Sequence, residues 1–165
     1  MELNITKKIS YFGIGIALYV VLSCIVNIPL LAGSHLQTDF GYIVFGAFLY
    51  IFGWQAMLIG VIGCLIKSLL ISGWIPIGWM LGQVLIGVMC GVVYKKTKNK
   101  IIWILMTVLA VFIGIGLIKT VVECLLYQIP FVVKFSKNCV AVIADIFPML
   151  GGLYIGDIVK VRLVK

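Results

Sequence analysis

Apolar runs of about 20 residues follow one another along almost the whole of this chain of 165 residues. Hydrophobic residues make up 64% of the chain and charged residues only 11%, whereas an average soluble domain carries about 25% charged residues. A helix needs about 20 mainly apolar residues to cross a bilayer, so six crossings fit with short loops between them. The sequence therefore predicts one all-α membrane domain, residues 1–165, folded as a compact bundle of six transmembrane helices.

Breaks in the apolar pattern predict where these helices begin and end. Pro29 disfavours helix in the residue before it, and Asp39 can cap a second helix that is short for a full crossing. Gly53 separates the second helix from the third, and Pro148 is expected to bend the last, as are Gly151 and Gly152. The predicted spans are Ile9–Ile28, Phe40–Phe52, Trp54–Ile71, Ile77–Tyr94, Ile101–Tyr127 and Val132 or Ser136 to Val159.

The basic residues predict the orientation in the membrane. They cluster before the first span (Lys7 and Lys8), in the Lys95–Lys100 loop and after the last span. Under the positive-inside rule, both termini and this loop are cytoplasmic. Lys134 and Lys137 break the rule and are expected to snorkel from an outer helix end. Nucleic-acid binding is not expected, because these clusters lack interleaved aromatics and a soluble fold.

A cleaved signal peptide is the alternative interpretation of the N-terminus. Lys7 and Lys8 precede an apolar run, and residues 32–34 (Ala-Gly-Ser) have the small side chains of a cleavage site. The run from Ile9 to Ile28 is longer than the usual apolar core of about 7–15 residues. We therefore expect the first helix to be retained.

Catalytic and metal-binding patterns are absent from the sequence. The five cysteines form no C-x-x-C pair, and His35 is the single histidine. There is also no phosphate-binding loop, H-E-x-x-H or G-x-S-x-G. The sequence predicts neither an enzyme nor a resident cofactor or metal, and this chain alone cannot be a nucleotide-driven pump.

Charged residues inside the apolar spans predict where the function lies. Lys119 and Glu123 are one helical turn apart, and Lys67 and Asp145 also interrupt apolar spans. Each such charge costs roughly 2.5–3.5 kcal/mol on insertion scales. Lys119 and Glu123 form either part of a ligand pocket or a self-neutralising ion pair, and Lys67 either joins the pocket or snorkels. Asp145 is too short to snorkel, so it needs Lys67, Lys119 or a ligand as its partner.

Further polar and aromatic side chains come from the outer halves of the later spans and the loop before the fourth. Trp79 and Gln83 are four residues apart and face the same way, and Asn138 lies in the outer half of the last span. Trp74 is expected either in the pocket or in the interfacial aromatic belt. The predicted substrate-binding residues are Glu123, Asp145, Lys119, Lys67, Asn138, Gln83, Trp79 and Trp74.

The first span carries a strip of small residues, Gly13-x-x-x-Ala17, with Gly15 nearby. Such strips allow two helices to approach closely. The strip either packs inside the bundle or receives a helix of another protein.

Taken together, the basic N-terminal pair, this strip, the Leu30–Thr38 loop and six spans in 165 residues resemble an S-component, the substrate-binding subunit of an energy-coupling factor (ECF) transporter. The stretch Leu36–Ile43, followed by a turn at Gly53, resembles the family's loop-to-second-helix region. The resemblance covers essentially the whole chain. The family's strip is typically Ala-x-x-x-Ala, and Gly13 departs from it.

The resemblance implies a function and a set of partners. Such proteins bind a vitamin or related micronutrient near the outer face, through the first loop, the loop between the third and fourth spans and the outer ends of the last three spans. Their first span, here with Gly13 and Ala17, docks on a membrane-embedded coupling subunit that two cytosolic ATPases drive. The mixed charges suit a zwitterionic or polar heterocycle of the thiamine, pyridoxine, folate, pantothenate or queuosine-precursor type.

Two other classes of protein remain as alternatives. One is a structural or assembly membrane subunit whose internal charges pair only with each other. The other is a small homo-oligomeric channel whose charges line a shared pore. Ion flux without ATPases would indicate the channel, and the absence of small-molecule binding would indicate the structural subunit.

Overall fold

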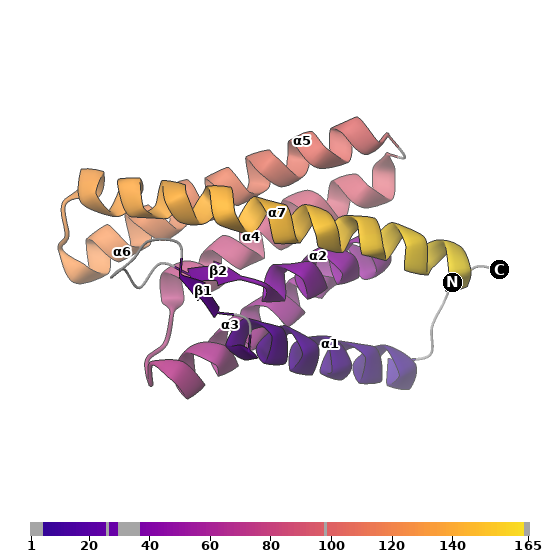
Figure 1. Cartoon of the computed structure of the whole chain (residues 1–165). Coiled ribbons are helices and arrows are strands. Elements are labelled where there is room, and N and C mark those ends of the chain that lie inside the picture. The colour runs from indigo at the N-terminus through magenta and orange to yellow at the C-terminus, as the bar shows by residue number, and fades with distance from the viewer. Residues whose placement is uncertain (1–4, 26, 30–36, 98, 164–165) are drawn as a thin grey trace.

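The computed structural model describes residues 5–25, 27–29, 37–97 and 99–163 of the chain (Figure 1). Most of the predicted Leu30–Thr38 loop, with residues 32–34 and His35, lies outside these residues. The described part is helical apart from two three-residue strands. Its elements are α1 (Ile5–Ile25), β1 (Asn27–Pro29), β2 (Gln37–Asp39), α2 (Gly41–Phe52), the 3₁₀ helix η1 (Gly53–Ala56), α3 (Met57–Ile71), α4 (Ile77–Lys96), α5 (Lys100–Val111), the π-helix η2 (Phe112–Lys119), α6 (Thr120–Tyr127) and α7 (Phe131–Leu163).

The two strands are the one departure from the predicted all-α class. They pair antiparallel, with Ile28 opposite Thr38. The first helix was expected to continue to Ile28, but it ends at Ile25, and residues 27–29 form β1 instead. Asp39, expected only as a helix cap, is the last residue of β2 and precedes α2.

Five helical stretches are long and apolar enough to cross a membrane: residues 5–25, 41–71, 77–96, 100–127 and 131–160. The chain is therefore a helical protein of the multi-pass membrane type. The predicted break at Gly53 is confirmed, because this residue has φ 72° and α2 ends there. The count of six crossings and the cytoplasmic position of the termini stay predictions.

Contacts along α1 show that α2 and α3 run in opposite directions. α2 begins beside the C-terminal half of α1, where Gly41 meets Tyr19, and ends beside the N-terminal half, where the rings of Phe52 and Phe12 are 5.3 Å apart. α3 returns, so that Gly63 again lies against Tyr19. The 31-residue stretch is thus a helical hairpin that turns at Gly53.

Glycines allow the closest helix contacts in the bundle. Gly46 on α2 faces the backbone of α7, and Gly152 and Gly156 on α7 face the backbone of α2. Gly82 on α4 meets Gly114 in the π-helix in the same way. The core between the helices consists of fully buried side chains that include Tyr19, Phe45, Leu49, Ile59, Ile86, Ile115 and Met149.

Two of the predicted spans differ in detail from the expectation. The fifth is continuous from Lys100 to Tyr127, but its middle is a π-helix, which the sequence did not predict. π-helical turns are rare and occur often at functional sites, and this one ends at the buried Lys119. α7 is not interrupted at Pro148.

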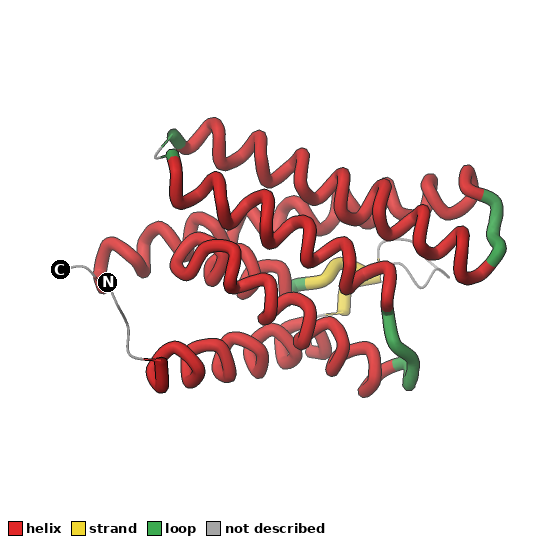
Figure 2. Tube along the Cα trace, turned by 180° about the vertical axis from the view of Figure 1, so that it is seen from behind, coloured by secondary structure: helices red, strands yellow, loops and turns green. Residues whose placement is uncertain are grey.

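The two ends of the bundle differ in what they carry. The start of α1, the end of α7 and the junction of α4 with α5 lie at one end, which we call the basic end (Figure 2). The ribbon and the junctions after α3 and α6 lie at the other, which we call the ribbon end. The loops therefore fall into two groups, one at each end of the bundle.

Candidate functional site

Buried polar side chains gather in the half of the bundle near the ribbon. Nine polar or charged side chains of the described residues are buried, and eight of them belong to two neighbouring clusters. We call the first the aspartate cluster: Tyr19, Ser23, Asp39, Lys67, Gln83 and Asp145. We call the second the lysine cluster: Trp79, Lys119, Thr120, Glu123, Lys134 and Asn138.

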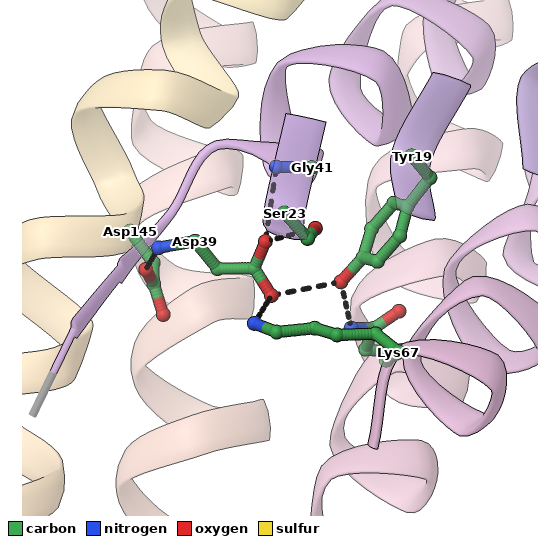
Figure 3. Close-up of polar contacts among 7 residues, drawn as sticks. Tyr19, Ser23, Asp39, Gly41, Lys67 and Asp145 are labelled. Atoms are coloured by element: carbon green, nitrogen blue, oxygen red, sulfur yellow. Dashed lines mark hydrogen bonds and ion pairs between the residues drawn. The ribbon is translucent and has the colours of Figure 1, made fainter. Parts of the chain in front are cut away.

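Asp39 is the centre of the aspartate cluster (Figure 3). Its Oδ1 accepts hydrogen bonds from the Ser23 hydroxyl at 2.5 Å and from the backbone N–H of Gly41 at 2.9 Å. Its Oδ2 accepts from Lys67 Nζ at 2.8 Å and from the Tyr19 hydroxyl at 3.2 Å. One carboxylate at the end of β2 therefore joins α1, α2 and α3.

The N-cap of α2 is Phe40 and not Asp39 as predicted, although Asp39 Oδ1 accepts the N–H of Gly41, the first residue of the helix. The sequence also missed the main role of Asp39. Asp39 is the ion-pair partner of Lys67, whose side chain is 19% exposed. Lys67 therefore does not simply snorkel to the interface. The sequence did contain a signal for this ion pair, namely a carboxylate at the edge of an apolar run. It did not show the partner, because Asp39 reaches Lys67 on α3 through the ribbon.

Asp145 and Gln83 keep unused hydrogen-bonding capacity. Asp145 is fully buried, and its Oδ1 accepts the backbone N–H of Asp39 at 3.1 Å. Its direct partner is thus this N–H and neither of the lysines that the sequence suggested. Gln83 donates from Nε2 to the Tyr19 hydroxyl at 2.8 Å. Asp145 Oδ2, Gln83 Oε1 and the Tyr42 hydroxyl are buried and have no hydrogen-bond partner among the described residues. Such atoms are rare in folded proteins and call for a ligand, a water or an ion.

The lysine cluster is built around Lys119, which is 5% exposed. Its Nζ donates to Asn138 Oδ1 at 2.6 Å and lies 3.8 Å from the centroid of the Trp79 ring. The Asn138 amide in turn donates to the Thr120 hydroxyl at 2.8 Å. The predicted contact with Glu123 is confirmed, with Lys119 Nζ 3.8 Å from Oε1.

Glu123 has a second and closer partner in Lys134. Lys134 Nζ is 3.2 Å from Glu123 Oε2, and its side chain is 23% exposed. The expectation that Lys134 only snorkels outward is therefore wrong. The sequence could not show this pair, because it joins two helices on either side of the turn at Pro130.

The charges of the two clusters are complementary. In their ordinary ionic forms, Asp39 and Asp145 outnumber Lys67 in the first cluster, while two lysines outnumber Glu123 in the second. Asn138 and Asp145 lie seven residues apart on α7, which is two helical turns and about 10 Å. The site therefore has an acceptor-rich end, a donor-rich end and no net charge, which suits a polar ligand that is neutral or zwitterionic.

The remaining predicted residues lie outside these clusters. Trp74 is 42% exposed and packs edge-on against Tyr127, with ring centroids 6.2 Å apart, as an interfacial aromatic would. Gly13 and Ala17 face outward from α1, and a Cβ at Gly13 would meet nothing within 4 Å. The strip therefore does not pack inside the bundle, whereas Gly15 packs against α2 and α3.

An apolar groove of about 600 Å³ lies between α2 and α7. Its lining includes Phe40, Ile43, Ile143 and Phe147, and Thr38 provides its polar edge. None of the described residues that line this groove is charged, so we do not assign it to a polar ligand. Among the described residues, no group of three His, Cys, Asp or Glu side chains could hold a metal ion.

Comparisons with known proteins agree with this arrangement. The model of the family described as ECF-type riboflavin transporter, S component, matches residues 4–165. A UPF0397 protein of Phytoplasma australiense is 28% identical over 151 residues, which cover 85% of this chain and 77% of the relative. A UPF0397 protein of Streptococcus thermophilus is 27% identical over 163 residues, which cover 92% and 89%. The crystal structure of an S-component for biotin from an ECF-type ABC transporter has the same fold, with a TM-score of 0.62 and 13% identity over 99% of this chain and 95% of that one.

Proposed function

The chain belongs to the family of ECF-type riboflavin transporter S-components, and we propose that it binds riboflavin, or a closely similar polar heterocycle, between its two buried polar clusters. Proteins of this family are substrate-binding membrane subunits of ECF transporters and not enzymes. Riboflavin is not among the vitamins that the residues alone suggested, but it belongs to the same wider class of polar heterocycles. It is therefore the first substrate to test.

The observation that carries this proposal is the set of unpartnered buried acceptors opposite a buried lysine. At one end, Asp145 Oδ2 and Gln83 Oε1 have no partner within the part of the chain that the structure describes, and at the other Lys119 supplies a donor. Riboflavin is uncharged, with carbonyl and ring-nitrogen acceptors, an N–H donor and a chain of hydroxyl groups. Such a molecule can satisfy both ends without bringing a net charge into the bundle, where a charge is costly.

We assign the site residues different roles. Lys119 and Asn138 donate to acceptor atoms of the substrate, and Asp145 and Gln83 accept from its donors. Both carboxylate oxygens of Glu123 face lysines, so Glu123 acts on the substrate by holding Lys119. Trp79 offers an aromatic face once Lys119 turns toward the ligand, Lys67 acts through Asp39, and Trp74 borders the entrance.

Docking completes the proposed function. S-components of ECF transporters work with a membrane-embedded coupling subunit and two cytosolic ATPases, and we place the coupling subunit against Gly13 and Ala17 on α1. Their exposure supports this assignment, because small side chains on an outward face leave room for another helix. The ribbon end then faces outward and the basic end the cytoplasm of a prokaryotic cell, with six crossings.

The test is equilibrium binding of riboflavin to the purified full-length protein in lipid nanodiscs, followed by quenching of flavin fluorescence. We expect saturable binding to one site. Gln83→Leu and Asp145→Asn should weaken binding, with roughly a ten- to hundredfold loss for Asp145→Asn, the value of a hydrogen bond to a charged group. Asp157→Asn is the matched control, because Asp157 lies at the basic end and pairs with Lys100 at 3.3 Å.

Biotin serves as the control ligand, because it is the substrate named for the solved protein of the same fold. Preferential binding of biotin would reject riboflavin as substrate but leave the S-component function standing. If neither vitamin binds, or if Asp145→Asn and Asp157→Asn behave alike, the proposed site is wrong.

A further inference from the structure

α1 is the least buried membrane helix of the described structure. Only 17% of its most apolar window is buried, against 39–50% for the other four stretches. Within the described residues, two of its side chains donate hydrogen bonds to another element. These are Tyr19 and Ser23, and both donate to the carboxylate of Asp39. Tyr19 also accepts a hydrogen bond from Gln83.

Polar contacts matter more than apolar ones for holding this helix. Lipid tails are as apolar as leucine, so an apolar helix face gains little by leaving lipid for protein. The N-terminal half of α1 packs through aromatic contacts, with the rings of Tyr11 and Phe12 6.0 and 5.3 Å from that of Phe52. The C-terminal half is fixed to Asp39. α1 is therefore tethered at the ribbon end and more weakly held toward the basic end.

The same aspartate reaches the candidate substrate site. Its backbone N–H donates to Asp145 Oδ1 at 3.1 Å, and its Oδ2 holds Lys67 at 2.8 Å (Figure 3). Asp145 carries one of the two unpartnered acceptors of the site. A displacement of α1 at Tyr19 and Ser23 would thus act on Asp39 and, through one peptide N–H, on a side chain of the site.

We propose that Asp39 is a positioning residue that couples α1 to the substrate site through its bonds with Ser23, Tyr19 and Asp145. The idea rests on the proposed function, which makes α1 the docking helix and Asp145 a substrate ligand. Docking at Gly13 and Ala17 shifts α1, and Asp39 passes this shift to Asp145 and the bound substrate. The simpler alternative is that Asp39 serves only as the counter-ion of Lys67.

Ser23→Ala separates the two roles, because it removes one donor to Asp39 and leaves the Lys67 ion pair intact. Ser10→Ala is the matched control on the same helix, where the hydroxyl is exposed and bonds only the Thr6 carbonyl, at 3.1 Å. Ser23 bonds Asp39 and is not one of the residues to which we assign a substrate contact, so for Ser23→Ala we expect the riboflavin dissociation constant to stay within about threefold of wild type. Uptake at saturating riboflavin by the complete transporter should fall roughly tenfold, the lower value for losing a charged hydrogen bond. If Asp39 had only a structural role, Ser23→Ala would change riboflavin binding and riboflavin uptake to the same extent.

Amide hydrogen exchange provides a readout that does not depend on riboflavin. In Ser23→Ala, the amide exchange rate should rise about tenfold in residues 19–25 of α1 and also in the segment around Asp145 on α7. Both segments should respond because Asp39, which bonds both, limits the local opening of each. Faster exchange confined to α1, or uptake equal to that of Ser10→Ala, would overturn the coupling role.

Tyr19→Phe removes the second donor to Asp39 and replaces Ser23→Ala in the hydrogen-exchange comparison if that variant does not fold. It does not replace it in the binding comparison, because the Tyr19 hydroxyl also accepts a hydrogen bond from the substrate-site residue Gln83. Failure of the wild-type protein to bind riboflavin would count against the proposed function alone, since the exchange result still decides whether Asp39 links the two helices.

Discussion

Replacing Glu123 by glutamine tests how the lysine cluster is held together. The change keeps the size of the side chain and removes the negative charge that Lys119 and Lys134 share. Breaking a buried ion pair from one side costs about 3–5 kcal/mol. Lys119 keeps its bond to Asn138 and its place over Trp79, and Lys134 is partly exposed, so we take the lower end, about 3 kcal/mol. For a chain of this size, that corresponds to a fall in Tm of roughly 6–12 °C.

The double variant Glu123→Gln/Lys119→Met shows where this loss comes from. Methionine removes the buried charge that glutamine leaves unpaired, so we expect at least half of the lost stability to return. Riboflavin affinity should remain weak, because Lys119 is then missing from the site. Thermal unfolding in nanodiscs without ligand gives the stability, and fluorescence titration gives the affinity.

Asp157→Asn is the control for the loss of a carboxylate. We expect it to cost at most about 1 kcal/mol, because its ion-pair partner Lys100 is 67% exposed and an asparagine oxygen can still accept the hydrogen bond from the Tyr50 hydroxyl. A Glu123→Gln protein as stable as this control would refute the ion-pair reasoning. Full recovery of stability in the double variant with unchanged riboflavin affinity would remove Lys119 and Glu123 from the substrate site.

Three further predictions concern the fold and its orientation. A cysteine at position 98, on a background without native cysteines, should resist an impermeant reagent added to intact cells, and its labelling from outside would reject a cytoplasmic Lys95–Lys100 loop. Gly13→Leu should abolish riboflavin uptake and co-purification of the coupling subunit while binding persists; loss of both binding and folding would instead place this face inside the bundle. Gly152→Leu should destabilise the protein by about 1–3 kcal/mol, because a Cβ at this position would meet the backbone at Ile43. Gly151→Leu is the control and should shift stability by less than about 1 kcal/mol, because a Cβ there would meet nothing within 4 Å. Equal effects of the two variants on Tm would contradict the packing of α2 on α7.

The sequence predicted the helices well because hydropathy reports directly on crossing a bilayer. The helix breaks at Gly53 and before Ile77 and Phe131 follow glycine and proline chemistry, which is local. The ribbon was missed because each strand has only three residues, too few for an alternating pattern. The π-helix was missed because no residue pattern within 112–119 marks it, and its contact with α4 at Gly82 and Gly114 joins distant parts of the chain.

The sequence predicted which charged residues belong to the candidate site but not which residues they pair with. Lys67, Lys119, Glu123 and Asp145 stood out because charges within apolar spans are costly. Their partners come from distant parts of the chain, and Asp39 in particular lies in a ribbon that the sequence did not indicate. Lys134 was assigned to the interface because the turn that brings it back to Glu123 cannot be read from spacing.

Native mass spectrometry of the full-length protein, released from membranes of cells that contain riboflavin, tests the central claim most directly. We predict that one riboflavin molecule remains bound to the wild-type protein and to Asp157→Asn. It should be lost from the doubly substituted Lys119→Met/Asp145→Asn protein, in which both ends of the site are changed but the net charge is not. A wild-type protein that carries no small molecule, or a double variant that still carries riboflavin, would contradict the assignment of the substrate to the two polar clusters.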